Sequence, residues 1–195
     1  NWMKKMVNYT TEENLEDSKK LAYMLQTMNE CEKPVLGLID GATMGGGVGL
    51  ASCLDFAVAT TKSFFALSEV KLGILPAVIS PFVIAKIGES HSRRYFISGE
   101  RFSSERAKDI GLVHEVAETK EQAQEILEEY IKQVMSSGPR ARVLAKKLVR
   151  DIKGQPNLEN KISYACDLIS TVRVSKEGQD GMGALLEKRK PSWNK

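Results

Sequence analysis

The residues most suited to take part in chemistry lie in a glycine-rich run. This run, from Asp40 to Leu50, reads DGATMGGGVGL and carries few bulky side chains at its centre. Glycine accepts a positive φ and has no Cβ, so a ligand oxygen can approach the backbone N–H groups that open a following helix. Those N–H groups, with the positive end of the helix dipole, stabilise an anion or a developing oxyanion. The run therefore predicts a backbone anion site at Gly45, Gly46 and Gly47.

Two common nucleotide sites fit this run poorly. A phosphate-binding P-loop needs a lysine and a hydroxyl after its last glycine, but Val48 and Gly49 follow the three glycines here. A dinucleotide-binding fingerprint needs a third glycine at the position where this chain has Ser52. Close packing of the helix on a strand also explains such glycines. These residues alone consequently leave the ligand open.

Glu69 is the candidate for proton transfer. It stands among the apolar residues of Ala66–Val70 and next to the turn Gly73–Pro76. Partial burial at such a place raises the pKa of a carboxyl group toward values that suit acid–base catalysis. A single glutamate beside a strand is more often a surface or ion-paired residue. Glu69 is therefore a candidate only in combination with the glycine run.

The elements expected around these residues alternate between helix and strand. Thr10 and Glu13 have the spacing of a capping box and open an amphipathic helix expected over 10–30. The elements expected after it are a strand at 34–39, a helix at 45–53, a strand at 55–59, an extended segment at 64–69, a turn at 73–76 with a helix behind it, a short helix from 103 and a strand at 112–116. Only helices follow, over 119–135, 140–152, 157–172 and 175–188. This order predicts an α/β core over 1–118 and a helical region over 119–195.

Composition narrows the class of protein. A hydrophobic content of 42% with 27% charged residues is typical of a globular chain, and no apolar run reaches the roughly 18 residues of a membrane span. Cys31, Cys53 and Cys166 lack a paired spacing, which favours reduced thiols in the cytoplasm, or in the mitochondrial matrix of a eukaryote. The two histidines, His91 and His114, form neither a metal-ligand pattern nor a catalytic triad.

The charge distribution also limits the partners. A net charge of +3 predicts neither a nucleic acid nor a membrane as partner. For the basic region of Lys4, Lys5, Lys19 and Lys20, a solvated helix face is favoured over RNA binding. The chain starts at Asn1 without a signal-peptide pattern, so we expect upstream sequence to be missing.

Four ordered segments resemble the crotonase superfamily, also called the enoyl-CoA hydratase/isomerase family. They are Lys33–Gly47, Leu67–Pro76, Ser98–Val113 and Leu186–Pro191. The resemblance implies an α/β fold, a spiral of ββα turns followed by a C-terminal helical region that forms a homotrimer, frequently a dimer of trimers. It also implies an acyl-CoA thioester as partner, whose enolate oxygen two backbone N–H groups stabilise. The resemblance implies no cofactor of the protein, because the substrate itself carries coenzyme A. It also implies no metal.

The resemblance assigns the chemistry to a few positions. Gly46 matches the second oxyanion donor of the family, and Glu69 matches the second of the two glutamates of typical hydratases. Gly49 stands where those hydratases have the first glutamate, which is a departure from the family pattern. The first oxyanion donor and the adenine-binding stretch are expected upstream of Asn1.

The resemblance also implies substrate-binding positions. Met44 and Gly45 belong to the oxyanion segment, and Ala77 matches a position near the attacking water or the acyl chain. Lys188 matches a lysine that reaches the CoA phosphates or the adenine end, and a solvated terminal charge is an equal alternative for it.

The expected reaction follows from the same resemblance. The segments Ala77–Phe82 and Arg173–Gly178 are most similar to bacterial methylglutaconyl-CoA hydratases, which implies reversible hydration of a short or branched 2-enoyl-CoA. With Glu69 as the single matching glutamate, two alternatives stay open. One is double-bond isomerisation, for which one proton carrier is enough. The other is acyl-CoA binding without catalysis.

Overall fold

The computed structural model describes residues 6–194, which fall into two compact units. The first unit holds residues 6–31 and 35–127, and the second holds residues 32–34 and 128–194. The boundary lies inside helix α6 (Lys120–Ser136), whereas the sequence-based division lies before that helix.

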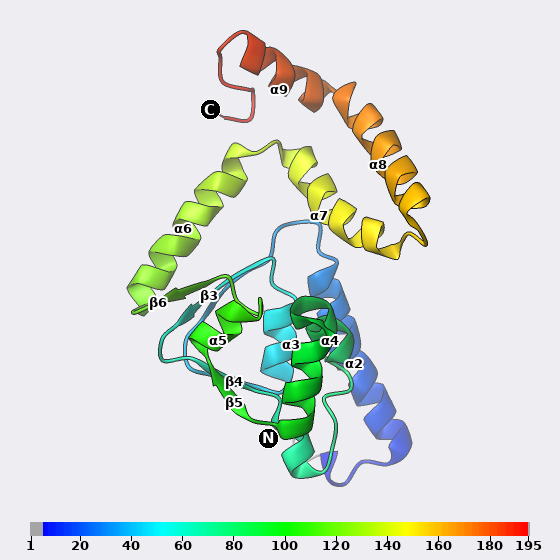
Figure 1. Ribbon diagram of the computed structural model, residues 1–195, viewed down its shortest axis with the longest axis vertical. Helices are drawn as coiled ribbons and strands as arrows, with labels where there is room; N and C mark the ends of the chain where they lie inside the picture. The colour runs from blue at the N-terminus through cyan, green and yellow to red at the C-terminus, as the bar shows by residue number, and fades with distance from the viewer. Residues whose placement is uncertain (1–5, 195) are drawn as a thin grey trace. The chain divides into compact units, whose positions relative to one another are not determined.

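Two small sheets form the frame of the first unit (Figure 1). The first sheet is parallel, in the order β1 (Leu36–Ile39), β3 (Phe56–Thr60) and β6 (Glu115–Ala117). In the second sheet, β2 (Ala42–Met44) is parallel to β4 (Phe64–Ala66), which is antiparallel to β5 (Arg101–Ser103). The order β1, β2, α3 (Gly46–Ser52) recurs as β3, β4 and the helices η1 (Ser68–Leu72) and α4 (Ser80–Ser98), so a strand of each sheet precedes helical structure twice, as expected for ββα turns in an α/β fold.

Helix α2 (Thr11–Asn29) precedes the strands of the first unit, and the other helices lie between or after them. These other helices are α3, the 3₁₀ helix η1, α4 and α5 (Ser104–Asp109). The capping box of α2 is confirmed, because Glu13 N–H donates to Thr10 Oγ1 at 3.2 Å and Thr10 N–H donates to Glu13 Oε2 at 2.8 Å. Helix α3 packs on α4, and α4 packs on η1 (Figure 1).

One hydrophobic core joins these elements. Its fully buried side chains include Leu25 of α2, Val48 of α3, Phe65 of β4 and Tyr95 of α4. Ile79, directly before α4, belongs to the same cluster and is 3% exposed. The core therefore holds the glycine-rich helix α3 between α2 and α4, which is the arrangement that positions the candidate site.

Parts of the sequence-based assignment are wrong in detail. The strand expected over 112–116 begins only at Glu115, because the N–H groups of Leu112 and Val113 donate to Ala107 O at 2.8 and 3.3 Å and so close the end of α5. Residues 68–72 turn into η1 instead of extending β4. Strands β2 and β5 were not expected at all.

The second unit is helical, as expected. It holds the end of α6, then α7 (Pro139–Gly154), α8 (Leu158–Arg173) and α9 (Lys176–Leu186). Glu177 of α9 accepts from Arg140 N–H at 2.9 Å and from Ala141 N–H at 2.7 Å, which satisfies the first donors of α7. The indole N–H of Trp193 donates to Ser136 O at 3.1 Å and fixes the C-terminal segment within this unit.

Candidate active site

The glycine turn connects β2 to α3 and is bonded to β4. Gly45 is the residue between strand and helix, with φ +52° and ψ −117°, a conformation that L side chains rarely adopt. Its N–H donates to Ala66 O, the last residue of β4, at 2.9 Å. This bond places the turn next to the segment that carries Glu69.

Two backbone donors open helix α3. Gly46 and Gly47 are its first residues, so their N–H groups have no acceptor within the helix. A Cβ built on Gly46 would meet no atom within 4 Å, which leaves open space beside this residue. The start of α3 thus presents two N–H groups without helical acceptors, and the positive end of the helix dipole lies at the same place.

The carboxylate of Glu69 faces this turn. A Cβ built on Gly45 would stand 3.1 Å from Glu69 Oε1, so any side chain at position 45 would crowd the carboxylate. The backbone of η1 holds the residue in place, because Ile74 N–H donates to Glu69 O at 3.2 Å. Among the described residues, no hydrogen-bond donor reaches Glu69 Oε2, although this oxygen is buried.

This environment changes the acid–base behaviour of Glu69. Burial of the carboxylate raises the pKa of Glu69 above its ordinary value, and a hydrogen bond from its own backbone N–H opposes the rise. A buried oxygen without a donor costs free energy unless a substrate or water supplies one. The raised pKa makes this carboxylate a stronger proton acceptor than an exposed glutamate.

The position of Gly49, one turn into α3, has no room for a side chain. A Cβ there would lie 2.5 Å from Ile79 Cγ2 and 2.9 Å from Ile79 Cβ. Leu25 Cδ1 would stand 3.6 Å away on another side. Ile79 and Leu25 thus occupy the space that a side chain at position 49 would enter.

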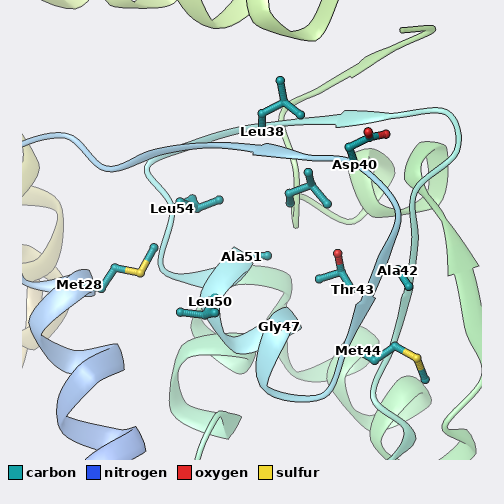
Figure 2. A pocket seen from close by; sticks show the side chains of 11 residues that line it. Met28, Leu38, Asp40, Ala42, Thr43, Met44, Gly47, Leu50, Ala51 and Leu54 are labelled. Carbon is teal, nitrogen blue, oxygen red and sulfur yellow. The ribbon is translucent and has the colours of Figure 1, made fainter. Parts of the chain in front are cut away.

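An open cavity of about 570 Å³ lies along α3, β1 and β2 (Figure 2). Its walls are mainly apolar and are formed by Met28, Leu38, Ile39, Asp40, Ala42, Thr43, Met44, Gly47, Leu50, Ala51 and Leu54. Asp40, on this wall, accepts a hydrogen bond from Thr60 Oγ1 at 2.7 Å. The cavity shares Met44 and Gly47 with the glycine turn, whereas Glu69 and Gly46 do not line it.

Two further predicted site residues, Ala77 and Lys188, belong to other segments of the chain. Ala77 is exposed in the loop before α4, where its carbonyl accepts from Ser80 N–H at 3.1 Å and from Ser80 Oγ at 2.7 Å. Lys188 belongs to the second unit, with φ +54°, and its N–H donates to Leu185 O at 3.3 Å. The first unit therefore brings together Gly45, Gly46 and Glu69.

Ile79 was missed by the sequence reasoning. Its contact with Gly49 joins residues of α3 and of the loop before α4, and no local pattern in the sequence predicts which side chain fills a glycine's space. A bulky β-branched residue close after the turn at Gly73–Pro76 was the only available signal.

Residues 6–194 contain no group of three or more His, Cys, Asp or Glu side chains that could hold a metal ion. None of the described helices is both long and apolar enough to cross a bilayer. In the basic region, Lys19 pairs with Glu16 of its own helix at 2.8 Å, while Lys4 and Lys5 lie outside the described residues.

Comparison with known proteins identifies the class. The fold is that of the crotonases: a crystal structure of an enoyl-CoA hydratase/isomerase (crotonase) from Legionella pneumophila superposes with a TM-score of 0.91 at 39% identity, covering 99% of this chain and 74% of that one. Residues 3–195 match the family model described as enoyl-CoA hydratase/isomerase. The chain belongs to the enoyl-CoA hydratase/isomerase family.

Curated relatives include both hydratases and isomerases. An enoyl-CoA hydratase of Alternaria alternata is 33% identical over 143 residues, which are 71% of this chain and 48% of that protein. A peroxisomal Δ(3,5)-Δ(2,4)-dienoyl-CoA isomerase of Arabidopsis thaliana is 27% identical over 178 residues, covering 91% of this chain and 64% of the isomerase. The chain thus spans about half the length of the Alternaria relative.

Proposed function

We propose that this protein processes acyl-CoA thioesters through an enolate, with Glu69 as the proton carrier and Gly46 N–H as an oxyanion donor. The observation that carries this proposal is the position of the Glu69 carboxylate against Gly45, with Oε2 buried and without a donor. The carboxylate can act as a base, and the N–H groups at the start of the helix beside it can stabilise an anion.

The reaction proposed first is reversible hydration of a short or branched 2-enoyl-CoA, of the methylglutaconyl-CoA type. The thioester oxygen accepts from Gly46 N–H while Glu69 takes a proton from water, and the oxygen of that water bonds to C3. The electron pair of the C2–C3 double bond moves onto the thioester as an enolate. Glu69 then returns the proton to C2, so one carboxylate completes an addition to one face.

The second candidate is double-bond isomerisation, and the filled space at Gly49 favours it. In this reaction Glu69 removes a proton from C2 of a 3-enoyl-CoA and returns it to C4, so no water and no second acid–base group take part. The apolar contacts of Ile79 and Leu25 at position 49 suit a site with a single carboxylate.

The proposal extends to assembly and location. A homotrimer, or a dimer of trimers, would cover the apolar side chains that α8 and α9 expose within the second unit, including Ile162, Ile169, Leu185 and Leu186. In such an assembly Lys188 would bind the phosphates of CoA. A cytoplasmic location suits both this ligand and the thiols of Cys31, Cys53 and Cys166, which form no disulfide within the described residues.

Product analysis with the full-length protein tests the proposal. Hydration removes the absorbance of the conjugated thioester in crotonyl-CoA or methylglutaconyl-CoA and yields a 3-hydroxyacyl product. Isomerisation of a 3-enoyl-CoA creates that absorbance and yields the 2-enoyl isomer without a hydroxyacyl product. Binding of CoA in calorimetry without turnover of either thioester would contradict the proposal and support a noncatalytic acyl-CoA-binding role.

A further inference from the structure

The segment that carries Glu69 contacts, on both sides of this residue, the corner between α4 and β5. Before Glu69, Ala66 of β4 is the register partner of Arg101 of β5. After Glu69, Val70 of η1 lies against Gly99, because a Cβ built on Gly99 would stand 3.2 Å from Val70 Cγ2. The corner therefore holds the chain directly before and directly after the proposed proton carrier.

Gly99 leaves no room for a side chain at this corner. It is buried, and its φ of +57° is one that L side chains rarely adopt. Besides Val70, Lys71 would crowd a Cβ at position 99, with Cε at 3.2 Å and Cγ at 3.3 Å. Contacts of this length would require the neighbours to move by a few tenths of an ångström.

The corner is the more firmly held side of this contact. Gly99 N–H donates to Tyr95 O at 3.0 Å, and Tyr95 is 1% exposed in the main core. On the other side, Lys71 is exposed and its long side chain can swing away, whereas Val70 is β-branched and has little rotamer freedom. A side chain at position 99 would consequently shift the backbone of η1 at Val70, which directly follows Glu69.

We propose that Gly99 is a positioning residue, which through its lack of a Cβ lets η1 pack closely enough to hold the Glu69 carboxylate against Gly45. The role of Glu69 as proton carrier rests on the proposed function, whereas the packing of Gly99 on η1 stands without it. A shift of η1 would move Oε1 relative to Gly45 and to the proposed oxyanion donor at Gly46. Displacement of a catalytic group by about 1 Å can cost roughly 10²-fold in rate, so smaller shifts are also measurable.

A comparison of Gly99→Ala with Gly111→Ala, both in the full-length protein, separates positioning from backbone strain. Gly111 has φ +79°, and its Cβ would stand 3.8 Å from Lys86 O, an ordinary contact distance, so its alanine variant is strained without being crowded. Both variants should lose several degrees of Tm. Gly99→Ala should also lower kcat with an enoyl-CoA by roughly tenfold at a nearly unchanged KM, whereas Gly111→Ala should keep the wild-type kcat. Equal kcat values in the two variants would overturn the proposal.

Two further variants keep this test decisive if Gly99→Ala is unstable. Gly99→Asn adds the same Cβ but tolerates a positive φ better, so it should lower kcat with a smaller loss of Tm. Val70→Ala removes Cγ2 from the contact, so the kcat loss caused by a Cβ at position 99 should be smaller in this background than in the wild type. A loss of the same size in both backgrounds would exclude Val70 as the connection between Gly99 and Glu69, and the proposal with it.

A stability measurement reports on the position of the carboxylate without any turnover. Because burial raises the pKa of Glu69, the Tm gain of Glu69→Gln should increase between pH 4 and pH 7. This pH-dependent gain should differ from the wild-type value in the Gly99→Ala background and equal it in the Gly111→Ala background. The same gain in all three backgrounds would contradict the positioning role of Gly99. A changed gain together with a wild-type protein that turns over no thioester would support this role and contradict the proposed function.

Discussion

The carboxylate of Glu69 lies against the backbone of Gly45, so close that a Cβ on Gly45 would stand 3.1 Å from Oε1. Gly45 N–H is bonded to Ala66 O, and Gly46 N–H opens α3 beside it. The proposed proton carrier and the proposed oxyanion donor thus come from two segments that one backbone hydrogen bond joins. This relationship determines which substitutions should affect catalysis and which should affect folding.

Gly45→Ala should impair both folding and activity. The variant places a methyl group next to Glu69 Oε1 and forces alanine to φ +52°. Backbone strain of this kind costs about 1–3 kcal/mol, which lowers the Tm by several degrees in a domain of this size. Thermal unfolding and the rate with an enoyl-CoA provide the measurements. A fully stable and active Gly45→Ala protein would contradict the geometry of the turn.

Gly46→Pro should remove the oxyanion donor without disrupting α3. Gly46 is the first residue of the helix, a position where proline is favoured and its missing N–H breaks no helical bond. Loss of one such donor lowers kcat by roughly 10²- to 10³-fold in known cases. Gly46→Ala keeps the N–H and has space for its methyl, so it is the matched control. Equal rates in the proline and alanine variants would exclude Gly46 N–H as the donor.

Glu69→Gln should stabilise the protein near neutral pH. The pKa of Glu69 is raised by burial, so the folded state binds its proton more tightly than the unfolded state. The penalty of the charged carboxylate is absent below the unfolded pKa of about 4.3 and grows as the pH rises through the folded pKa. The Tm gain of the variant should therefore be larger at pH 7 than at pH 4. A Tm gain that does not increase with pH would argue against burial as the cause.

His114 should make the first unit sensitive to acid. Its Nδ1 accepts from Ala57 N–H at 3.0 Å, and its ring stacks on Phe56 at 5.2 Å. Burial, followed by the positive charge of Lys86, lowers the pKa of His114. The unfolded state therefore binds the proton first, and stability is lost as the pH falls through about 6.5 and below.

The matched variant for this effect is His114→Asn, which keeps an acceptor for Ala57 N–H but does not titrate. Between pH 7 and pH 5, the Tm of the wild type should fall more steeply than the Tm of the variant. Parallel Tm profiles would show that protonation of His114 is not the cause.

The elements that sequence predicted best are those defined by local signals. The capping box of Thr10 and Glu13, and the periodic apolar residues after it, gave α2 almost to its ends. Strand β2 was missed because three residues in a glycine-rich run become a strand only through pairing with β4. The late start of β6 was also unpredictable, since it depends on the N–H groups of Leu112 and Val113 bonding back to Ala107 O.

The candidate site also combines features that have local sequence signals with a contact that depends on tertiary packing. The glycine run predicted N–H groups without helical acceptors at the start of α3, and the apolar context of Glu69 predicted the burial that raises its pKa. The catalytic roles of Gly46 and Glu69 stay predictions. The contact of Gly49 with Ile79 joins residues far apart in the sequence, and its consequence depends on distances of a few tenths of an ångström. Such a contact requires the packed core and has no signature in either segment alone.

The most direct measurement of the central claim is the turnover of an enoyl-CoA by the full-length Glu69→Gln protein. Glutamine keeps the shape of the side chain and removes its capacity to carry a proton, so kcat should fall by about 10²- to 10⁴-fold, the range of general acid–base catalysis. Binding of the thioester and the fold should be retained. A Glu69→Gln protein that converts the thioester at the wild-type rate would contradict the assignment of Glu69 as the proton carrier.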